Sequence, residues 1–204
     1  QHPDYARVRE LAERLNRLVG NLLDMTRLQA GGLVPRKEWT PLEEVVGAAL
    51  ERASHGLRDH PVQVQLPQDL MLVPLDSVLI EQVLLNLLDN AAKHTAPGTA
   101  ILVAARAEQH RVVVEVADRG PGLPEGSEQL VFDKFYQAQS SAGRLPGAAV
   151  GAGRGAGLGL AIVRGIVMAH GGTVAASNRQ GGGAVFSFQL PVEGQPPSPP
   201  AEDP

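Results

Sequence analysis

The sequence predicts an α/β protein, a two-layer sandwich of helices on a mixed β-sheet, preceded by one long coiled-coil-like helix. Strand and helix patterns follow one another irregularly along the chain, which is typical of a mixed sheet. Hydrophobic residues make up 43% of the 204 residues and aromatic residues only 3%, so we expect an aliphatic core. A regular apolar stripe marks the first 30 residues as a separate helix.

Composition excludes several classes of protein. Lys and Arg number 18 against 22 Asp and Glu, a net charge of −4, whereas nucleic-acid-binding domains usually carry a basic excess. The absence of cysteine excludes disulfide scaffolds, thiolate zinc sites and cysteine nucleophiles. No apolar run approaches the roughly 20 residues of a membrane-spanning helix, and no secretion signal opens the chain. We therefore expect this segment to contact neither nucleic acid nor membrane.

The expected N-terminal helix carries a narrow apolar seam with alternating spacings of three and four residues. Gly31-Gly32 ends the helix, and Pro35 prevents it from resuming. Such a seam cannot be buried by one helix alone, so it predicts a partner helix. Packing of the seam on the rest of this chain is the alternative. The seam consists of Val8, Leu11, Leu15, Leu18, Leu22 and Met25.

The next elements begin with a short strand at 38–39. Thr40, Pro41 and Glu43 have the spacing of a capping box with proline at the first helical position, which predicts a helix to about Ala53. Apolar residues alternate over 62–66 as in a half-buried strand, and a short apolar run over 70–73 precedes Pro74.

The second half of the chain contains the remaining expected elements. Asp76 should cap an apolar helix that continues to about Lys93. From Glu193 onward the chain is rich in proline and should form no core. Between these points we expect strands at 101–107 and 112–116, a helix at 158–169, and a hairpin of strands at 174–177 and 185–190.

Three clusters of residues could carry chemistry, and the first lies on the helix that follows Asp76. Asn86, Asn90 and Lys93 are spaced i, i+4 and i+7, so two amides and one ammonium share a stripe. Amide oxygens suit Mg²⁺, and a lysine supplies a point charge for phosphate. The alternative is a helix whose asparagines face solvent.

The second cluster, Asp118, Gly120 and Gly122, directly follows a strand. A carboxylate there can accept a hydrogen bond from an amino group, and the glycines permit a planar ring to approach the backbone. An ordinary turn with a capping Asp is the alternative.

The third cluster is a glycine run over 153–160 that leads directly into an apolar helix. Free backbone N–H groups and the positive end of the helix dipole suit phosphate oxygens. The run is not a P-loop, because no Gly-Lys-Ser/Thr follows, and no strand leads directly into it as a dinucleotide fold requires.

Together and in this order, the clusters resemble the N, G1 and G2 boxes of the ATP-binding domain of sensor histidine kinases, a Bergerat (GHKL) fold. Phe132–Tyr136 resembles its F box, and Asn21–Gln29 resembles the second helix of the dimerisation and histidine-phosphotransfer domain. The resemblance covers residues 8 to 191. It implies three parts, a truncated dimerisation helix over 1–31, a catalytic domain over 37–192 and a disordered tail over 193–204. Segments at 37–39, 43–47 and 178–191 are most similar to the potassium-responsive sensor kinases.

The resemblance also implies residue roles and the ligands ATP and Mg²⁺. Asn90, assisted by Asn86, would hold Mg²⁺ on the triphosphate, Asp118 would accept from the adenine amino group, and residues 138–156 would form a mobile lid. The remaining implied nucleotide-binding residues are Lys93 and His94 on the helix, Gly120 and Gly122 around the base, Lys134, and Gly155, Gly157, Leu158 and Gly159 at the phosphates.

The sequence departs from the family pattern at several places. Gln137 stands where arginine is common, so Lys134 or an arginine of the lid would contact the γ-phosphate. His94 stands where an aromatic ring is common. None of the six histidines has the sequel of a phosphoacceptor, so the acceptor is expected on a helix absent from this chain. His60, His110 and His170 are interpreted as surface or capping residues.

The resemblance implies a catalytic module that transfers the γ-phosphoryl of Mg-ATP to a histidine, for relay to an aspartate of a response regulator, in potassium or osmotic signalling. The parent would be a homodimeric bacterial inner-membrane sensor, with this module in the cytoplasm. Two alternatives remain open, an ATP hydrolase of the same fold and a degenerate interaction module. Hydrolases of this fold usually carry a glutamate base at the position of Asn86, and an amide cannot take a proton.

Overall fold

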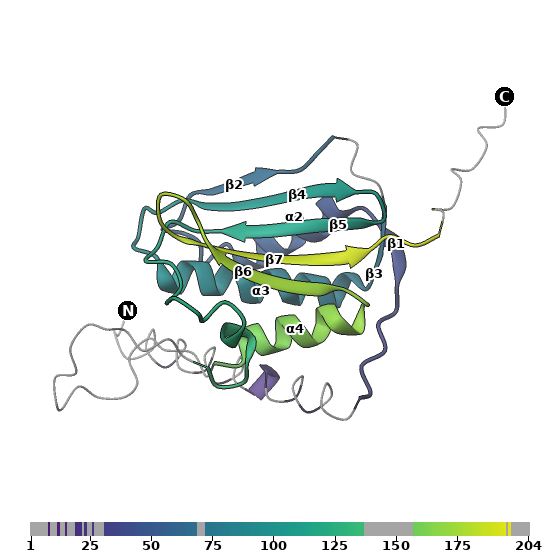
Figure 1. Ribbon diagram of the computed structural model, residues 1–204, viewed down its shortest axis with the longest axis horizontal. Helices are drawn as coiled ribbons and strands as arrows, with labels where there is room; N and C mark the ends of the chain where they lie inside the picture. The colour runs from purple at the N-terminus through teal and green to yellow at the C-terminus, as the bar shows by residue number, and fades with distance from the viewer. Residues whose placement is uncertain are drawn as a thin grey trace.

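The computed structural model describes residues 31–68, 72–136, 157–194 and 196, together with eight residues between 8 and 26. Its main layer is a five-stranded sheet in the order β2-β4-β5-β7-β6 (Figure 1). β2 runs parallel to β4 and every other neighbouring pair is antiparallel, so the predicted mixed sheet is confirmed. The strands are β2 (Val62–Gln65), β4 (Ile101–Glu108), β5 (Arg111–Ala117), β6 (Thr173–Asn178) and β7 (Ala184–Pro191).

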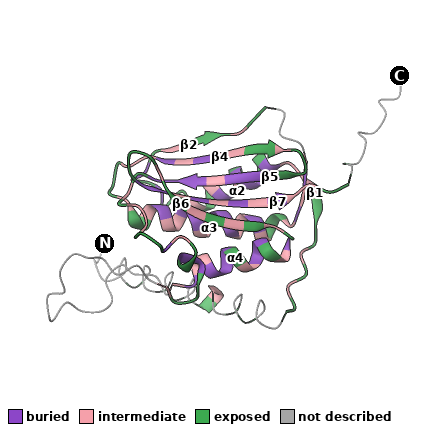
Figure 2. Cartoon of the chain, in the orientation of Figure 1, coloured by how far each residue is buried: buried purple, intermediate pink, exposed green. Residues whose placement is uncertain are grey.

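Helices cover one face of this sheet and form the second layer (Figure 1). They are α2 (Leu42–Ala53), α3 (Ser77–His94) and α4 (Gly159–Ala169), with the short 3-10 helix η1 (Leu130–Phe132) beside α4. Buried residues line the strands and the sheet-facing side of α3 (Figure 2). The core is aliphatic as expected; in its one aromatic pair among the described residues, Phe132 meets Phe186 edge-to-face with 6.2 Å between ring centroids.

The two predicted helix caps have different outcomes. Asp76 caps α3 as predicted, because its Oδ1 accepts a hydrogen bond from the Leu79 N–H at 3.2 Å. The prediction of a capping box at the start of α2 was wrong. Thr40 ends strand β1 (Glu38–Thr40), where its hydroxyl donates to the Glu38 carbonyl at 3.0 Å. Pro41 becomes the N-cap residue, without a side-chain hydrogen bond, and the helix begins at Leu42.

A second, two-stranded sheet joins β1 to β3 (Val73–Leu75) in antiparallel register. The expected apolar run over 70–73 stopped before Pro74, but β3 begins at Val73 and passes through this proline, which lies opposite Trp39. A two-stranded sheet has only edges, and proline is tolerated there because its missing N–H can face away from the partner strand. Residues 69–71 lie outside the described residues.

His170 joins the C-terminal end of α4 to the beginning of α3. Its Nε2 lies 3.1 Å from the Asp76 N–H, which can only donate, and its Nδ1 lies 2.8 Å from the Ile166 carbonyl, which can only accept. The ring is therefore neutral, with the proton on Nδ1. Burial lowers the pKa of His170, which is only 1% exposed.

The histidine predictions were right in part. His170 is the C-cap residue of α4, and His110 is exposed on the β4–β5 turn. His60 is neither a surface nor a capping residue: it is buried, with its Nδ1 3.1 Å from the Thr99 carbonyl.

The N-terminal seam lies mostly outside the described residues. All eight described residues between 8 and 26 are helical, and the two of them that belong to the seam, Val8 and Leu15, are 62% and 61% exposed. The predicted lid over 138–156 lies outside the described residues, as does all of the tail except 193, 194 and 196. Among the described helices, none has the length and apolar character needed to cross a membrane.

Candidate nucleotide-binding site

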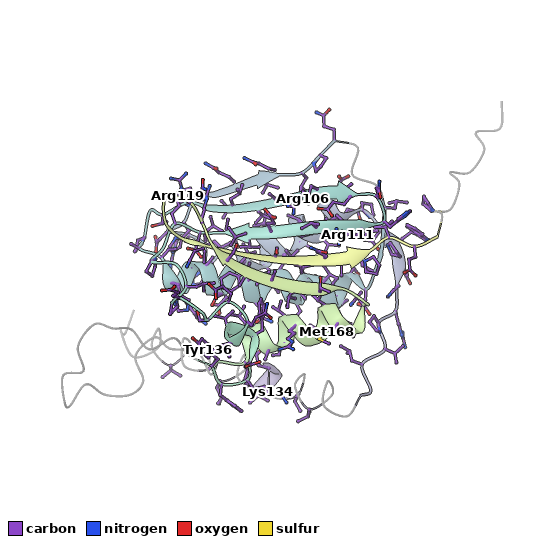
Figure 3. All side chains as sticks on the ribbon, viewed as in Figure 1. Arg106, Arg111, Arg119, Lys134, Tyr136 and Met168 are labelled. Atoms are coloured by element: carbon purple, nitrogen blue, oxygen red, sulfur yellow. The ribbon has the colours of Figure 1, made fainter. Side chains whose placement is uncertain are left out.

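The described members of the three clusters lie on α3, on the loop after β5 and at the start of α4. The C-terminal end of α3, the end of β5 and the turn between β6 and β7 meet at the same end of the sandwich (Figure 1). Arg119, which follows Asp118, is labelled at this end of the sheet in Figure 3. The fold therefore brings together segments that are far apart in the sequence.

Asp118 is a buried carboxylate, 3% exposed, immediately after β5. Its Oδ1 accepts hydrogen bonds from the N–H groups of Gly120 at 2.8 Å and Ala184 at 3.2 Å. Its own N–H donates to the Ala184 carbonyl at 2.9 Å. Within the described part of the chain, Oδ2 has no hydrogen-bond partner. One oxygen thus fixes the side chain, and the other remains available to a donor.

Gly120 and Gly122 must lack side chains because other residues of the chain pack closely against them. A Cβ on Gly120 would lie 2.6 Å from the His94 carbonyl oxygen, at the end of α3. Gly122 has φ of +78°, and a Cβ there would lie 2.6 Å from Oδ1 of Asn178. The sequence interpretation assigned both glycines to the approach of a planar ring, but backbone conformation and internal packing already require them.

The turn between β6 and β7 contributes residues that the sequence analysis did not select. Gly183 has φ of +101°, and a Cβ there would lie 2.0 Å from the Asp118 carbonyl oxygen. Asn178 forms two hydrogen bonds to the backbone of Leu123. The run of three glycines over 181–183, immediately before a strand, was the signal that a close backbone approach occurs here.

Asn86 connects α3 to the start of α4. Its Oδ1 lies 3.3 Å from where a Cβ of Gly159 would be, so a larger residue would crowd the amide. Its Nδ2 is buried and has no hydrogen-bond partner among the described residues. A buried donor without an acceptor is costly unless a ligand supplies one, and an anionic phosphate oxygen has the required chemistry. Asn90 follows one helical turn later and is half-buried. The amide nitrogen of Asn86 therefore fits a triphosphate oxygen, and the amide oxygen of Asn90 has the chemistry that suits Mg²⁺.

Lys93 and His94 lie at the exposed C-terminal end of α3. The Lys93 ammonium forms an ion pair with Asp89 one turn earlier, and both side chains are about one-third exposed at 35% and 36%. Exposed pairs of this kind are weak. A phosphate could therefore replace Asp89 as the partner of Lys93 at little cost.

The beginning of α4 offers backbone donors. Within the part of the chain that the structure describes, no side chain caps this helix, and the N-cap residue Leu158 is buried. Gly157 has φ of +68°; its carbonyl accepts the Phe135 N–H at 2.9 Å, and a Cβ there would lie 2.9 Å from the Phe135 Cα. The segment with exposed Lys134 is thereby held beside α4 (Figure 3). Gly155 lies outside the described residues.

Comparisons with known proteins agree with this arrangement. The family described as histidine kinase-, DNA gyrase B-, and HSP90-like ATPase matches residues 75–194. Sensor protein KdpD of Escherichia coli is 44% identical over 93% of this chain and 20% of its own length. The probable sensor histidine kinase TcrY of Mycobacterium tuberculosis is 34% identical over 94% of this chain and 38% of its own. The structure of full-length ShkA in complex with AMPPNP is similar with a TM-score of 0.75 and 29% identity, over 91% of this chain and 37% of that one.

The matched region begins at the last residue of β3, ends just beyond β7, and contains all described members of the three clusters. The chain spans about a fifth of the length of KdpD, so most of that relative has no counterpart in the compared sequence. The fold and the matches agree: this chain belongs to the family of histidine kinase-, DNA gyrase B- and HSP90-like ATPases, as an ATP-binding domain of the sensor histidine kinase type.

Proposed function

We propose that this chain is the catalytic part of a two-component sensor kinase and transfers the γ-phosphoryl group of Mg-ATP to a histidine on a dimerisation helix. The observation that carries the proposal is the pairing of an uncapped helix N-terminus with the unpartnered amide nitrogen of Asn86. Both present hydrogen-bond donors that the described residues leave without side-chain acceptors. A triphosphate supplies acceptors of the required charge.

The residues of the chain would bind and orient ATP in two groups. Asp118 would accept a hydrogen bond from the adenine amino group through Oδ2, because Oδ1 is already used by the protein. The backbone of Gly157 and Gly159 would donate to phosphate oxygens, with Lys93 adding a positive charge. Asn90 and Asn86 would hold Mg²⁺, which supplies charge neutralisation when bound. Positioning and charge neutralisation account for most of the catalysis of phosphoryl transfer.

Asn86 separates this proposal from an ATP hydrolase of the same fold. A hydrolase needs a base that takes a proton from the attacking water, and a neutral amide cannot do so. We therefore expect little steady-state hydrolysis by this chain.

The similarity to sensor kinases supports a proposal for the partners of this chain. Sensor kinases such as KdpD and TcrY are the proteins to which this chain is similar. We propose a homodimeric parent that passes the phosphoryl group to an aspartate of a response regulator, with the similarity to KdpD favouring potassium or osmotic signalling. This module would lie on the cytoplasmic side of an inner-membrane sensor.

The proposal is tested with γ-labelled ATP. The chain alone should bind ATP in a Mg²⁺-dependent manner and should not become labelled, because none of its six histidines lies in an acceptor context. When a separate polypeptide with an acceptor histidine on its dimerisation helix is added, that polypeptide should acquire acid-labile label slowly, since the tether that raises effective concentration is missing. Label on the chain itself, or rapid release of free phosphate, would contradict the proposal.

A further inference from the structure

Asn178, the last residue of β6, holds the loop after β5 with both ends of its amide. Its Oδ1 accepts the Leu123 N–H at 2.6 Å, and its Nδ2 donates to the Leu123 carbonyl at 2.9 Å. The two residues are 55 positions apart in the chain. An amide that pairs with both polar groups of one residue fixes the orientation of the backbone there, as a single hydrogen bond would not.

The same hairpin also holds the other end of this loop. The N–H of Ala184, the first residue of β7, donates to Asp118 Oδ1 at 3.2 Å, and its carbonyl accepts the Asp118 N–H at 2.9 Å. Gly183 lies directly against the Asp118 carbonyl. The loop from Asp118 to Leu123 is therefore anchored at its first residue by β7 and at its last residue by Asn178.

Between these anchors the loop contains two glycines, which are intrinsically flexible, and Pro121, whose ring fixes its own φ. Gly120 and Gly122 have no side chains to restrict them, and Gly122 is in a positive-φ conformation. Yet the Gly120 N–H must stay in place, because it is one of two donors that hold Asp118 Oδ1. Asn178 also lies against Gly122 itself, since a Cβ there would lie 2.6 Å from Asn178 Oδ1.

We propose that Asn178 is a positioning residue for recognition of the adenine base: by holding Leu123, it keeps Gly120 on one oxygen of Asp118 and so directs the other oxygen toward the amino group. This inference rests on the proposed function, in which Asp118 reads that group. Asn178 acts through the loop and touches no nucleotide atom in this scheme. Its loss should therefore reduce discrimination between bases more than it reduces binding of the phosphates.

The test compares binding of ATP with binding of inosine triphosphate, in which a carbonyl oxygen replaces the amino group. Asn178→Ala should reduce the preference for ATP about fivefold to tenfold, the size expected when a net hydrogen bond is lost. Ser177→Ala is the matched control, because Ser177 is exposed on the same strand and should change nothing. An unchanged preference in Asn178→Ala would overturn the inference.

A double-mutant cycle distinguishes positioning from general support of the fold. If Asn178 acts through Asp118, Asn178→Ala should have almost no effect on base preference in an Asp118→Asn background, whereas independent effects would add. Additive effects would contradict positioning. If Asn178→Ala does not fold, Asn178→Asp, which can still accept the Leu123 N–H but cannot donate to the Leu123 carbonyl, supplies the same measurement with a smaller loss of preference.

The two proposals fail in different ways. A wild-type chain that binds ATP no better than inosine triphosphate would remove Asp118 from base recognition and with it the role of Asn178. A wild-type chain with a clear preference that Asn178→Ala leaves intact would remove Asn178 alone.

Discussion

Replacing Asp118 with asparagine separates binding of the base from stability of the fold. The carboxylate has two roles on its two oxygens. Oδ1 accepts the N–H groups of Gly120 and Ala184, and Oδ2 has no partner in the described structure. Asparagine keeps a carbonyl oxygen of the same shape for the first role, and it places an NH₂ group where Oδ2 was. The substitution therefore changes the chemistry on the side that faces the proposed base.

The magnitudes follow from these contacts. A hydrogen bond to a charged acceptor contributes about 1.5–3 kcal/mol, so its loss should weaken the binding of ATP about 10- to 150-fold. Facing the adenine amino group with a second donor adds to the loss. The free energy of unfolding should change by less than about 1 kcal/mol, since both hydrogen bonds to Oδ1 have an acceptor in asparagine. Asp118→Ala differs, because it leaves the buried N–H of Ala184 and the part-buried N–H of Gly120 without their acceptor, and the first loss alone should destabilise the fold by about 1–3 kcal/mol.

Titration calorimetry with Mg-ATP measures the affinity, and urea denaturation of the same preparations measures stability. Asp118→Asn should show weak binding with near-normal unfolding, and Asp118→Ala should show both defects. If Asp118→Asn binds ATP as tightly as the wild type, Asp118 does not read the base. If it binds weakly only because it is unfolded, the division of roles between the two oxygens is wrong.

Three further predictions concern other parts of the structure. Gly183→Ala should destabilise the fold by about 3 kcal/mol or more in urea denaturation, because its Cβ would lie 2.0 Å from the Asp118 carbonyl oxygen. Gly182→Ala is the control: Gly182 has the same φ of +101° but nothing within 4 Å of its Cβ position, so this variant should lose only about 1–2 kcal/mol of stability. Equal losses in the two variants would refute the clash at Gly183. Burial lowers the pKa of His170 below its ordinary 6.5, so below about pH 6.5 the unfolded chain binds more protons than the folded chain, and the free energy of unfolding should fall as the pH decreases. His170→Gln should remove this pH dependence of stability between pH 7.5 and 5.5. A pH dependence that persists in the variant would exclude His170 as its source. Lys93→Met should weaken the binding of Mg-ATP about fivefold in calorimetry. The free energy of unfolding should change by less than about 0.5 kcal/mol, since the ion pair of Lys93 is exposed. An unchanged affinity would place the lysine outside the phosphate site.

The sequence predicted most of the fold because the relevant signals are local. Alternation of apolar residues identified β2, and Asp76 followed by an apolar periodic run identified the start of α3. Thr40 shows where a local signal misleads. Its spacing to Glu43 is that of a capping box, but pairing with Val73 keeps Thr40 in a strand, one residue before the N-cap position. Tertiary pairing decided between two locally acceptable conformations.

The candidate site was predictable where residue type and spacing carry the chemistry, as for Asn86 and Asn90 one turn apart on α3. It was not predictable where the role depends on a distant segment. Asn178 reads in sequence as the last residue before a turn, and only the folded chain places its amide against Leu123. Likewise, Gly120 was interpreted as space for a ligand, whereas the carbonyl of His94 already occupies that space.

The two ends of the candidate site differ in how their polar groups are satisfied, and this difference assigns them different tasks. At the base end, the loop that carries Asp118 is hydrogen-bonded at both of its ends to the β6–β7 hairpin, so little conformational freedom remains to be lost on binding. At the proposed phosphate end, the described residues offer no acceptor to the amide nitrogen of Asn86 and no side-chain cap to the start of α4, so a bound anion would supply the acceptors. Under the proposed function, a preorganised base end would discriminate among nucleotides, because a wrong base would leave Asp118 Oδ2 without a donor. The proposed phosphate end would supply affinity that depends on charge, and hence on Mg²⁺ and ionic strength, without regard to the base.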